Sequence, residues 1–410
     1  MELGLNRCDN SILCRAFFLA LVICLFCYYP VCCDSEGEVI TLENARYVGL
    51  FQTLTGHTDR VWTVVFSPDG QLLASCDQSS NTIVWNTTTF GIVQTLIGYS
   101  PRTVGLAFSP DGSMLATGEA YGATGPIRIW NTSTWGLERV LPGHGQSCWT
   151  LDFQESTGIL ASGGFDTYVK LWNPSTGELL NTLYGHTAGV LSVDFNPVQN
   201  IIASSGIDQT VRLWNSETGE PGLILEGHTE NIGYVKFSPD GNTVASSADD
   251  NTIRLWDVAT GDLIWLQDGG QYWVNCVNFN PAGDLMLTCG HDGSVVIRDA
   301  STGESLKRLE GHGNAVIRGA FNPAGTMMAT ASWDHTVRIW KVIYICGDSD
   351  GSRSIDILDI VFLINYLYKN GPEPISLSES DVNNDEKINI LDIVYLINFI
   401  YKNGQAPNCP

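Results

Sequence analysis

The 410 residues of this chain are enough for two or three domains, and a composition of 44% hydrophobic and 10% aromatic residues is typical of a folded protein. The formal net charge is −23. Nucleic acid is therefore excluded as an expected partner, because its phosphates require basic grooves. The composition suits a soluble secreted protein.

The first segment, residues 1–33, has the pattern of an export signal. Arg7 and Arg15 precede an unbroken apolar run at 16–33, and an acidic stretch follows it. A basic start, an apolar middle and a polar exit predict a signal peptide, and hence an extracellular location. The apolar run is also close to the length that spans a bilayer, so an uncleaved membrane anchor is the alternative. Residues 34–46 form a polar lead-in.

From Gly56 to Trp340 the chain repeats a unit that opens near Gly-His and closes on a tryptophan. The closing tryptophans are Trp85, Trp130, Trp172, Trp214, Trp256 and Trp340. From Trp130 onward the closing positions are 42 residues apart, and Arg298 fills the one slot without tryptophan. Each unit has four short apolar runs separated by turn residues, which predicts four antiparallel strands. Seven such units predict a mainly β fold, a seven-bladed β-propeller over residues 47–343.

The ends of this region predict how the propeller closes. Residues 47–54 have the pattern of an outer strand without a unit of its own, and the last unit ends at Trp340 without an outer strand. We therefore expect 50–54 to complete the seventh blade, because closure removes an open sheet edge.

These repeats resemble the WD-repeat family over about three quarters of the chain. The resemblance implies a tetrad of His, Ser or Thr, Asp and Trp in each blade, joined by hydrogen bonds. Four units carry it at offsets of 18, 22 and 28 residues from the histidine: His144, Ser162, Asp166, Trp172; His186, Ser204, Asp208, Trp214; His228, Ser246, Asp250, Trp256; and His312, Thr330, Asp334, Trp340. Elsewhere Ser79 takes the aspartate slot, Tyr99 and Gly270 take histidine slots, and Arg298 takes a tryptophan slot. The regular spacing assigns these His and Asp residues to structure rather than to catalysis or metal binding.

Two positions in each unit are expected on the face around the central channel, where WD-repeat proteins often contact partners. The residues there are Trp62, Trp149, Leu191 and Ile317 at the first position and Phe165, Ile207, His291 and Trp333 at the second, with Trp273 two residues short of the first. Exposed aromatic surface marks interaction sites and stacks on sugar rings, so a protein or a glycan is the expected ligand. The alternative is that several of these rings pack on neighbouring blades.

The cysteines outside the leader show no zinc-like spacing. Cys276 and Cys289 lie symmetrically about a turn at 280–283, and either a disulfide or two buried thiols fit that position. Cys346 and Cys409 bracket the tail and are disulfide candidates in an oxidising compartment.

The tail, residues 346–410, contains a repeat of its own: the segment 357–371 recurs at 390–404. Each copy predicts an amphipathic helix that ends at Asn-Gly, a left-handed cap. Before each helix, oxygen donors at loop positions 1, 3, 5, 7, 9 and 12 predict a calcium ion, and hence two ions. The expected ligands are Asp348, Asp350, Ser352, the Ser354 carbonyl, Asp356 and Asp359 in the first loop, and Asp381, Asn383, Asp385, the Lys387 carbonyl, Asn389 and Asp392 in the second.

This pair of units resembles a type I dockerin domain over the whole tail. The resemblance implies calcium-dependent attachment to a cohesin module of an extracellular scaffolding protein. By the same resemblance the docking residues are Ile357 and Leu358 in the first unit and Ile390 and Leu391 in the second. An intramolecular contact of these residues is the alternative.

The expected function is a secreted, monomeric binding or scaffolding protein without catalytic activity. The alternative is a carbohydrate-active protein in polysaccharide catabolism, either a hydrolase of O-glycosyl bonds or an accessory glycan-binding module, because dockerins commonly accompany glycoside hydrolases. Hydrolysis needs two carboxylates beside the sugar, and the candidates are Glu119, Asp152, Asp194 and Asp249. A pair in a cleft with raised pKa values favours the enzyme; an aromatic face without such a pair favours binding.

Overall fold

The computed structural model describes residues 32–34, 37–97, 102–120, 124–270, 272–352, 354–374, 376–385, 387–402 and 406–407. The chain divides into two compact units, one over Ser35–Ile343 and the other including Tyr344–Pro410. The predicted signal peptide lies outside the described residues except for its last two, which belong to β1 (Cys32–Asp34). Among the described residues, no helix is both long and apolar enough to cross a membrane.

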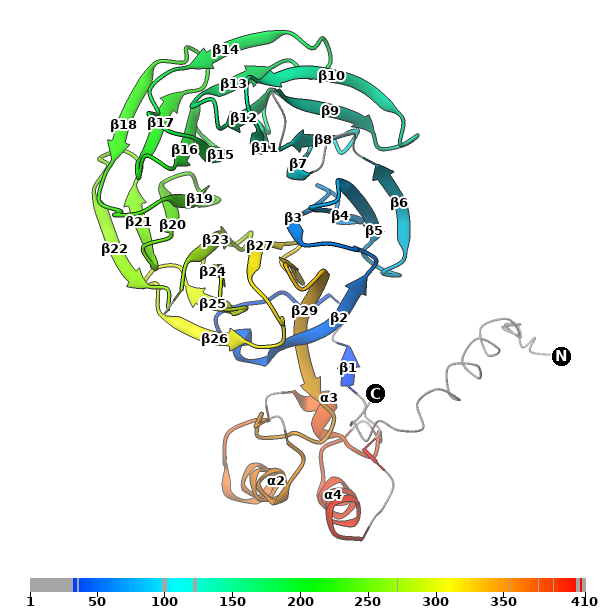
Figure 1. Ribbon diagram of the computed structural model, residues 1–410. Coiled ribbons are helices and arrows are strands. Elements are labelled where there is room, and N and C mark those ends of the chain that lie inside the picture. Colours follow the sequence, from blue (N-terminus) through cyan, green and yellow to red (C-terminus); the bar gives the residue numbers. More distant parts are fainter. Residues whose placement is uncertain are drawn as a thin grey trace, which may run out of the picture. The chain divides into compact units, whose positions relative to one another are not determined.

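The larger unit is a seven-bladed β-propeller, which confirms the predicted fold class (Figure 1). Each blade is an antiparallel sheet whose first strand lies nearest the channel. The first four blades are β3 (Val61–Phe66), β4 (Leu72–Asp77), β5 (Asn81–Asn86), β6 (Ile92–Ile97); β7 (Thr103–Phe108), β8 (Met114–Glu119), β9 (Gly125–Asn131), β10 (Leu137–His144); β11 (Cys148–Phe153), β12 (Leu160–Gly164), β13 (Val169–Trp172), β14 (Leu179–Leu183); and β15 (Val190–Phe195), β16 (Ile201–Gly206), β17 (Val211–Asn215), β18 (Pro221–Leu225). The fifth and sixth are β19 (Ile232–Phe237), β20 (Thr243–Ala248), β21 (Thr252–Asp257), β22 (Leu263–Asp268); and β23 (Val274–Phe279), β24 (Leu285–Gly290), β25 (Val295–Asp299), β26 (Ser305–Leu309).

The seventh blade joins the two ends of the propeller, as the sequence predicted. It consists of β27 (Val316–Phe321), β28 (Met328–Ser332), β29 (Thr336–Ile345) and β2 (Val48–Thr55), which follows the short 3-10 helix η1 (Ala45–Tyr47). Strand β2 pairs with β29 in a register that sets Leu54 opposite Val337. Strand β1 also pairs with β29. The outermost strand of this blade therefore comes from the start of the chain and the other three from its end.

The buried face of β2 is expected to hold this closure together. Leu54 is 2% exposed and packs in a cluster that joins the seventh blade to the first, whereas Leu50 on the same strand is 41% exposed. We predict that Leu54→Ala lowers the free energy of unfolding by about 2–5 kcal/mol, because it leaves a cavity in this cluster. The control Leu50→Ala is expected to change it by less than about 0.5 kcal/mol. Urea denaturation measures both, and equal effects would contradict the prediction.

The tail unit contains two helices of equal length at the spacing of the sequence repeat. They are α2 (Ile357–Lys369) and α4 (Ile390–Lys402), with the short α3 (Leu377–Ser380) between them. The apolar faces of α2 and α4 form a small core of Ile360, Leu363, Ile393 and Leu396, together with Val382 from the segment before α4. Helix α2 begins with a capping box at Asp356 and ends at Asn370, whose φ of 54° is the predicted left-handed cap.

Candidate functional site

The four complete tetrads form the predicted hydrogen bonds inside their blades. In the fourth blade, the two ring nitrogens of His186 lie 2.8 Å from Asp208 Oδ2 and 2.7 Å from Ser204 Oγ, and Trp214 Nε1 donates to the same Oγ at 2.8 Å. The third, fifth and seventh blades repeat this pattern. Burial raises the pKa of Asp208, but the interactions with His186, the Thr187 N–H and Thr210 together outweigh burial, and the pKa falls to about 2. These polar groups are satisfied by one another, which fits a structural role.

The first blade also has a tetrad, and our assignment of Ser79 to its aspartate slot was wrong. His57 bonds Asp77 at 3.0 Å and Ser75 at 2.7 Å, and Trp85 donates to Ser75 at 2.8 Å. Ser79 instead donates to the exposed Asp59 at 3.1 Å. The carboxylate reaches the histidine from two residues earlier because Asp77 is the last residue of β4, beside the turn.

The second and sixth blades lack the full tetrad, as predicted. In the second, Trp130 Nε1 donates to Thr117 at 3.1 Å, and Tyr99 lies outside the described residues. In the sixth, Arg298 is buried and donates to Thr288 Oγ1 at 3.2 Å and to the Gly303 carbonyl at 3.1 Å. The guanidinium therefore replaces the indole N–H as the donor to the hydroxyl residue.

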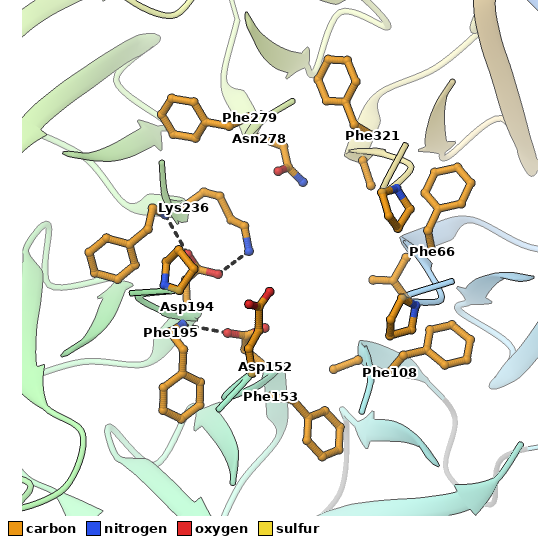
Figure 2. A pocket seen from close by; sticks show the side chains of 18 of the residues that line it. Phe66, Phe108, Asp152, Phe153, Asp194, Phe195, Lys236, Asn278, Phe279 and Phe321 are labelled. Atoms are coloured by element: carbon orange, nitrogen blue, oxygen red, sulfur yellow. Dashed lines mark hydrogen bonds and ion pairs between the residues drawn. The ribbon is translucent and has the colours of Figure 1, made fainter. Parts of the chain in front are cut away.

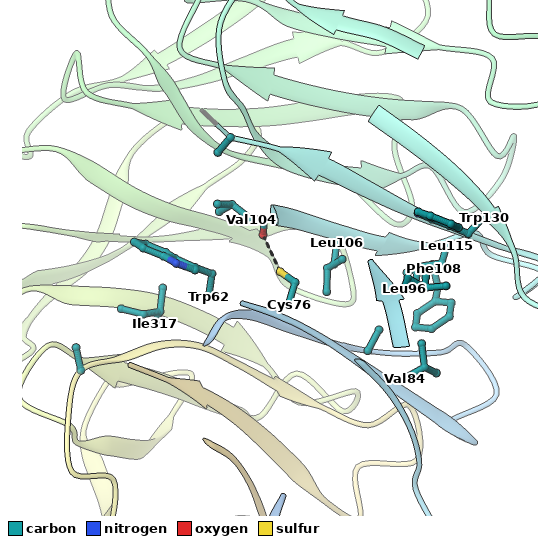
Figure 3. Packing of buried hydrophobic residues seen from close by; sticks show 13 residues of the cluster. Trp62, Cys76, Val84, Leu96, Val104, Leu106, Phe108, Leu115, Trp130 and Ile317 are labelled. Carbon is teal, nitrogen blue, oxygen red and sulfur yellow. Dashed lines mark hydrogen bonds between the residues drawn. The ribbon is translucent and has the colours of Figure 1, made fainter. Parts of the chain in front are cut away.

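The predicted aromatic face is largely packed against itself. We call Trp62, Trp149, Phe165, Trp273, His291 and Trp333 the aromatic cluster. Its ring centroids form a continuous series of contacts, with 5.7 Å from Trp62 to Trp149 and 5.2 Å from Trp62 to Trp333. Trp62 is 9% exposed and lies in a buried cluster with Ile317 (Figure 3), so the expectation that both lie on the surface was wrong. The rings meet because inner strands converge on the channel, where large side chains fill the space.

The remaining members offer a partner less surface than the sequence suggested. Trp273 is 48% exposed and Ile207 is 38% exposed, whereas Trp149, Phe165, Leu191 and Trp333 are partly buried. Arg60 lies over the Trp333 ring at 4.7 Å, which adds a cationic group. The exposed part of the face is therefore mixed aromatic and polar.

A second candidate site lies where the inner strands end, in a cavity of about 820 Å³ (Figure 2). We call it the channel cavity. Asp152, Asp194, Lys236 and Asn278 point into it from four consecutive blades, β11, β15, β19 and β23. Lys236 forms an ion pair with Asp194 Oδ1, and the Phe237 N–H donates to Asp194 Oδ2 at 2.7 Å. Both oxygens of Asp194 are thus engaged.

Asp152 has a different environment from its neighbour. The Phe195 N–H donates to it at 2.7 Å, and it makes no ion pair with any residue that the structure describes. Burial, and next the charge of Asp194, raise the pKa of Asp152 to about 7, while Lys236 acts in the opposite direction. Burial also raises the pKa of Asp194. The cavity therefore holds one carboxyl group whose charge is not fully compensated.

Two of the four carboxylates proposed as catalytic candidates lie together, and the other two do not join them. Glu119 pairs with Arg128 at 2.5 Å, and Asp249 accepts from Asn231 at 3.0 Å. Sequence reasoning missed Lys236 and Asn278. The repeat spacing could have identified them, since positions 152, 194, 236 and 278 are 42 residues apart and are equivalent positions in four units.

The raised pKa of Asp152 leads to a prediction about stability and pH. The folded protein keeps this proton up to a pH of about 7, whereas an unfolded aspartate releases it near about 3.9, so wild-type stability falls as the pH rises between these values. Asp152→Asn removes this penalty. We expect the variant to be more stable than wild type on the order of 2 kcal/mol at pH 8, with the gain shrinking toward zero at pH 4.

Urea denaturation at both pH values measures this gain. The groups that face Asp152 in the cavity, Asp194, Glu155, Lys236 and Tyr234, are common to both proteins, so the difference reports position 152. A variant that is less stable at pH 8, or a gain that does not depend on pH, would contradict the prediction.

The first tail loop brings its predicted ligands together. One oxygen each from Asp348, Asp350 and Asp359 lies within 4.8 Å of the others. Burial, and next the charges of Asp350 and Asp348, raise the pKa of Asp359 to about 7, although it accepts backbone N–H groups. Gly351, at loop position 4, has a φ of 75°, which lets the loop fold back tightly. Carboxylates at such spacing fit a hard divalent cation.

The second loop has the same internal bonds and one further indication. Asp381 accepts from the Asp385 N–H at 3.0 Å, and Asp392 accepts from the Asn389 N–H at 2.8 Å. The Oδ1 atom of Asn383 is buried and has no hydrogen-bond partner within the described part of the chain. Asn383 is the predicted ligand at loop position 3, so a cation there would satisfy an otherwise costly buried oxygen. The residues of both loops therefore fit calcium.

The predicted docking residues are all exposed at the start of the two helices. Ile357 and Leu358 are 51% and 56% exposed, and Ile390 and Leu391 are 49% and 55% exposed. The two pairs are 33 residues apart and have nearly the same exposure. Each helix thus presents the same apolar surface next to an acidic loop.

The cysteines separate into two groups. Cys346 is disulfide-bonded, and its predicted partner Cys409 lies outside the described residues. Cys276 and Cys289 are free thiols, buried and directly opposite each other on β23 and β24. Of the two alternatives for this pair, the structure shows the buried thiols.

Comparison with known families matches both units. The family described as the IFT122 first beta-propeller matches residues 148–366, which is more than half of the chain. This chain belongs to that β-propeller family. The WD domain, G-beta repeat, matches residues 49–86 and 90–131, and the dockerin type I domain matches residues 346–401. WD-repeat propellers and dockerin domains both support a role in protein interaction.

One curated protein is similar to a short segment of this chain. The probable cytosolic iron-sulfur protein assembly protein Ciao1 of Anopheles gambiae is 51% identical over 37 residues. The match covers 9% of this chain and 11% of that protein, so the chain spans about a tenth of the length of the relative. The similarity concerns a short segment, not a whole protein.

Proposed function

We propose that this protein is a secreted, non-catalytic binding protein whose tail docks onto a cohesin-type module of an extracellular partner in a calcium-dependent manner. The observation that carries the proposal is the repeated apolar surface beside the two loops. Large apolar side chains half exposed in matched positions are expensive to leave in water and are typical of a contact surface. The match of the tail to the dockerin type I domain supports the same role.

The residues expected to bind calcium also position the docking surface. Asp356 accepts from the Leu358 N–H at 2.7 Å and so fixes the first turn of α2. Asp359 accepts from the Ser349 N–H at 2.7 Å and from the Asp356 N–H at 2.8 Å, which ties the loop to the helix. Bound calcium supplies the positive charge that allows these carboxylates to lie together. Metal binding and the presentation of Leu358 are therefore coupled.

The test measures binding of the full chain to a panel of purified type I cohesin modules by calorimetry. Leu358→Asp combined with Leu391→Asp is expected to weaken binding at least 100-fold, and a chelator is expected to abolish it. The control combines Tyr368→Ser with Tyr401→Ser, which are 63% and 59% exposed near the other ends of the helices. The control is expected to retain binding within threefold. Wild-type binding to no module, or binding that survives the chelator, would overturn the proposal.

The second candidate is a carbohydrate-active protein, which the raised pKa values of Asp152 and Asp194 in the channel cavity favour. The same cavity weakens the hydrolytic version. Both oxygens of Asp194 are bound to Lys236 and to a backbone N–H, whereas the two-carboxylate mechanism requires two groups that reach the sugar. Turnover of aryl glycosides that Asp152→Asn abolishes would establish the enzyme and contradict the non-catalytic proposal.

A further inference from the structure

We propose that the channel cavity binds an alkylammonium group, either that of a free amine or that of a lysine side chain. The proposal concerns the propeller alone and does not rest on docking of the tail. It is carried by the arrangement of charged and apolar residues around the cavity.

The polar half of the cavity carries an excess of negative charge. Three carboxylates line it, from Asp152, Glu155 and Asp194, against the single ammonium of Lys236. Lys236 is paired with Asp194, whose second oxygen accepts a backbone N–H, so these two groups satisfy each other. The uncompensated charge therefore lies at Asp152 and Glu155. A cation is the ligand that this half of the cavity lacks.

In the other three blades, the inner strands present an apolar wall to the cavity. The fifth residue of the inner strand is Asp152, Asp194, Lys236 or Asn278 in four of the blades. In the other three blades it is Val65, Ala107 or Ala320. Pro68, Pro110 and Pro323 also line this side, together with Ser67 and Asn322, whose side chains form hydrogen bonds within their own turns. A ligand that carries a positive charge on an alkyl chain matches both halves at once, since its chain contacts the wall while its ammonium reaches Asp152.

The aromatic residues argue against a sugar in this place. Figure 2 shows the rings of Phe66, Phe108, Phe153, Phe279 and Phe321 pointing away from the centre of the cavity. Sugars and flat aromatic cations bind on exposed ring faces. None of these five phenylalanines turns a ring face toward the cavity. A volume of about 820 Å³ admits an extended chain. The net charge of −23 attracts cations to the whole molecule.

The experiment titrates the full chain by calorimetry at pH 8, where Asp152 is ionised. The probes are 1,5-diaminopentane and an acetylated, amidated Gly-Lys-Gly peptide, with the norleucine peptide as the uncharged match. Binding of either cationic probe is expected, together with at least tenfold weaker binding of the norleucine peptide. If only the diamine binds, the ligand of the cavity is a small free amine. If the lysine peptide binds, the ligand is a lysine side chain of a protein segment.

Asp152→Asn is expected to weaken binding at least tenfold. Asp262→Asn makes the same change of charge at an exposed turn and is expected to stay within twofold. Thermal melting checks that both variants are folded, and Asp152→Asn is expected to melt at or above the wild-type temperature. Wild-type protein that binds neither cationic probe, or equal affinity in Asp152→Asn, would overturn the inference. Cohesin binding by the same samples is measured separately, so failure here is distinguishable from failure of tail docking.

Discussion

Removal of calcium is expected to unfold the tail while the propeller stays folded. The tail core consists of five fully packed side chains, and each of its two main helices has only 13 residues, a length that is marginally stable in water. Without a cation, the carboxylates of Asp348, Asp350 and Asp359 repel one another at short distance. We therefore expect a unit with so small a core to depend on metal, and on the disulfide at Cys346, for its stability.

Hydrogen–deuterium exchange of the full chain, with and without chelator, measures this effect. Peptides from α2 and α4 are expected to lose nearly all protection when calcium is removed, and peptides from β15–β18 are expected to keep theirs. Asp359→Ala and Asp392→Ala are expected to raise the calcium concentration needed for protection at least tenfold. Glu373→Gln, an exposed carboxylate outside both loops, is the control. Helices that remain protected in chelator would show that calcium is not required for folding.

The second large effect is expected from Ser204→Ala in the fourth blade. The Ser204 hydroxyl is fully buried and bonds both His186 and Trp214. Without this hydroxyl, the buried His186 Nε2 atom and the buried Trp214 Nε1–H group lose a hydrogen-bond partner. Each such loss costs about 1–3 kcal/mol. We therefore expect the free energy of unfolding to fall by about 2–5 kcal/mol.

The same blade offers a matched control. Ser192 is 1% exposed, and its hydroxyl makes a single long bond of 3.5 Å to the Val235 carbonyl. Ser192→Ala is expected to cost less than half as much as Ser204→Ala in urea denaturation. Equal losses from the two variants would mean that the tetrad adds no more than an ordinary buried hydroxyl.

The features that depend on regular spacing could be predicted from the sequence alone. The 42-residue period from Trp130 onward predicted the blades, because each unit must bury its faces against the next. The offsets from each histidine predicted four tetrads, because each tetrad lies within one blade and its geometry follows from local strand and turn lengths. The arrangement of the two acidic loops and the exposure of Ile357 and Leu358 were also predictable, since one loop and the helix that follows it form a single local structure.

Contacts between different blades, and contacts that depend on how a turn bends, could be established only from the tertiary structure. Asp77 rather than Ser79 reaches His57, because the carboxylate at the end of β4 faces the histidine. Trp62 is buried rather than exposed, because strands distant in sequence converge on one channel. Asp194 and Lys236 are 42 residues apart and form an ion pair only when the ring of blades brings their slots together. The repeat spacing assigns each residue to a position in its blade, but only the closed ring of blades shows which of these residues are in contact.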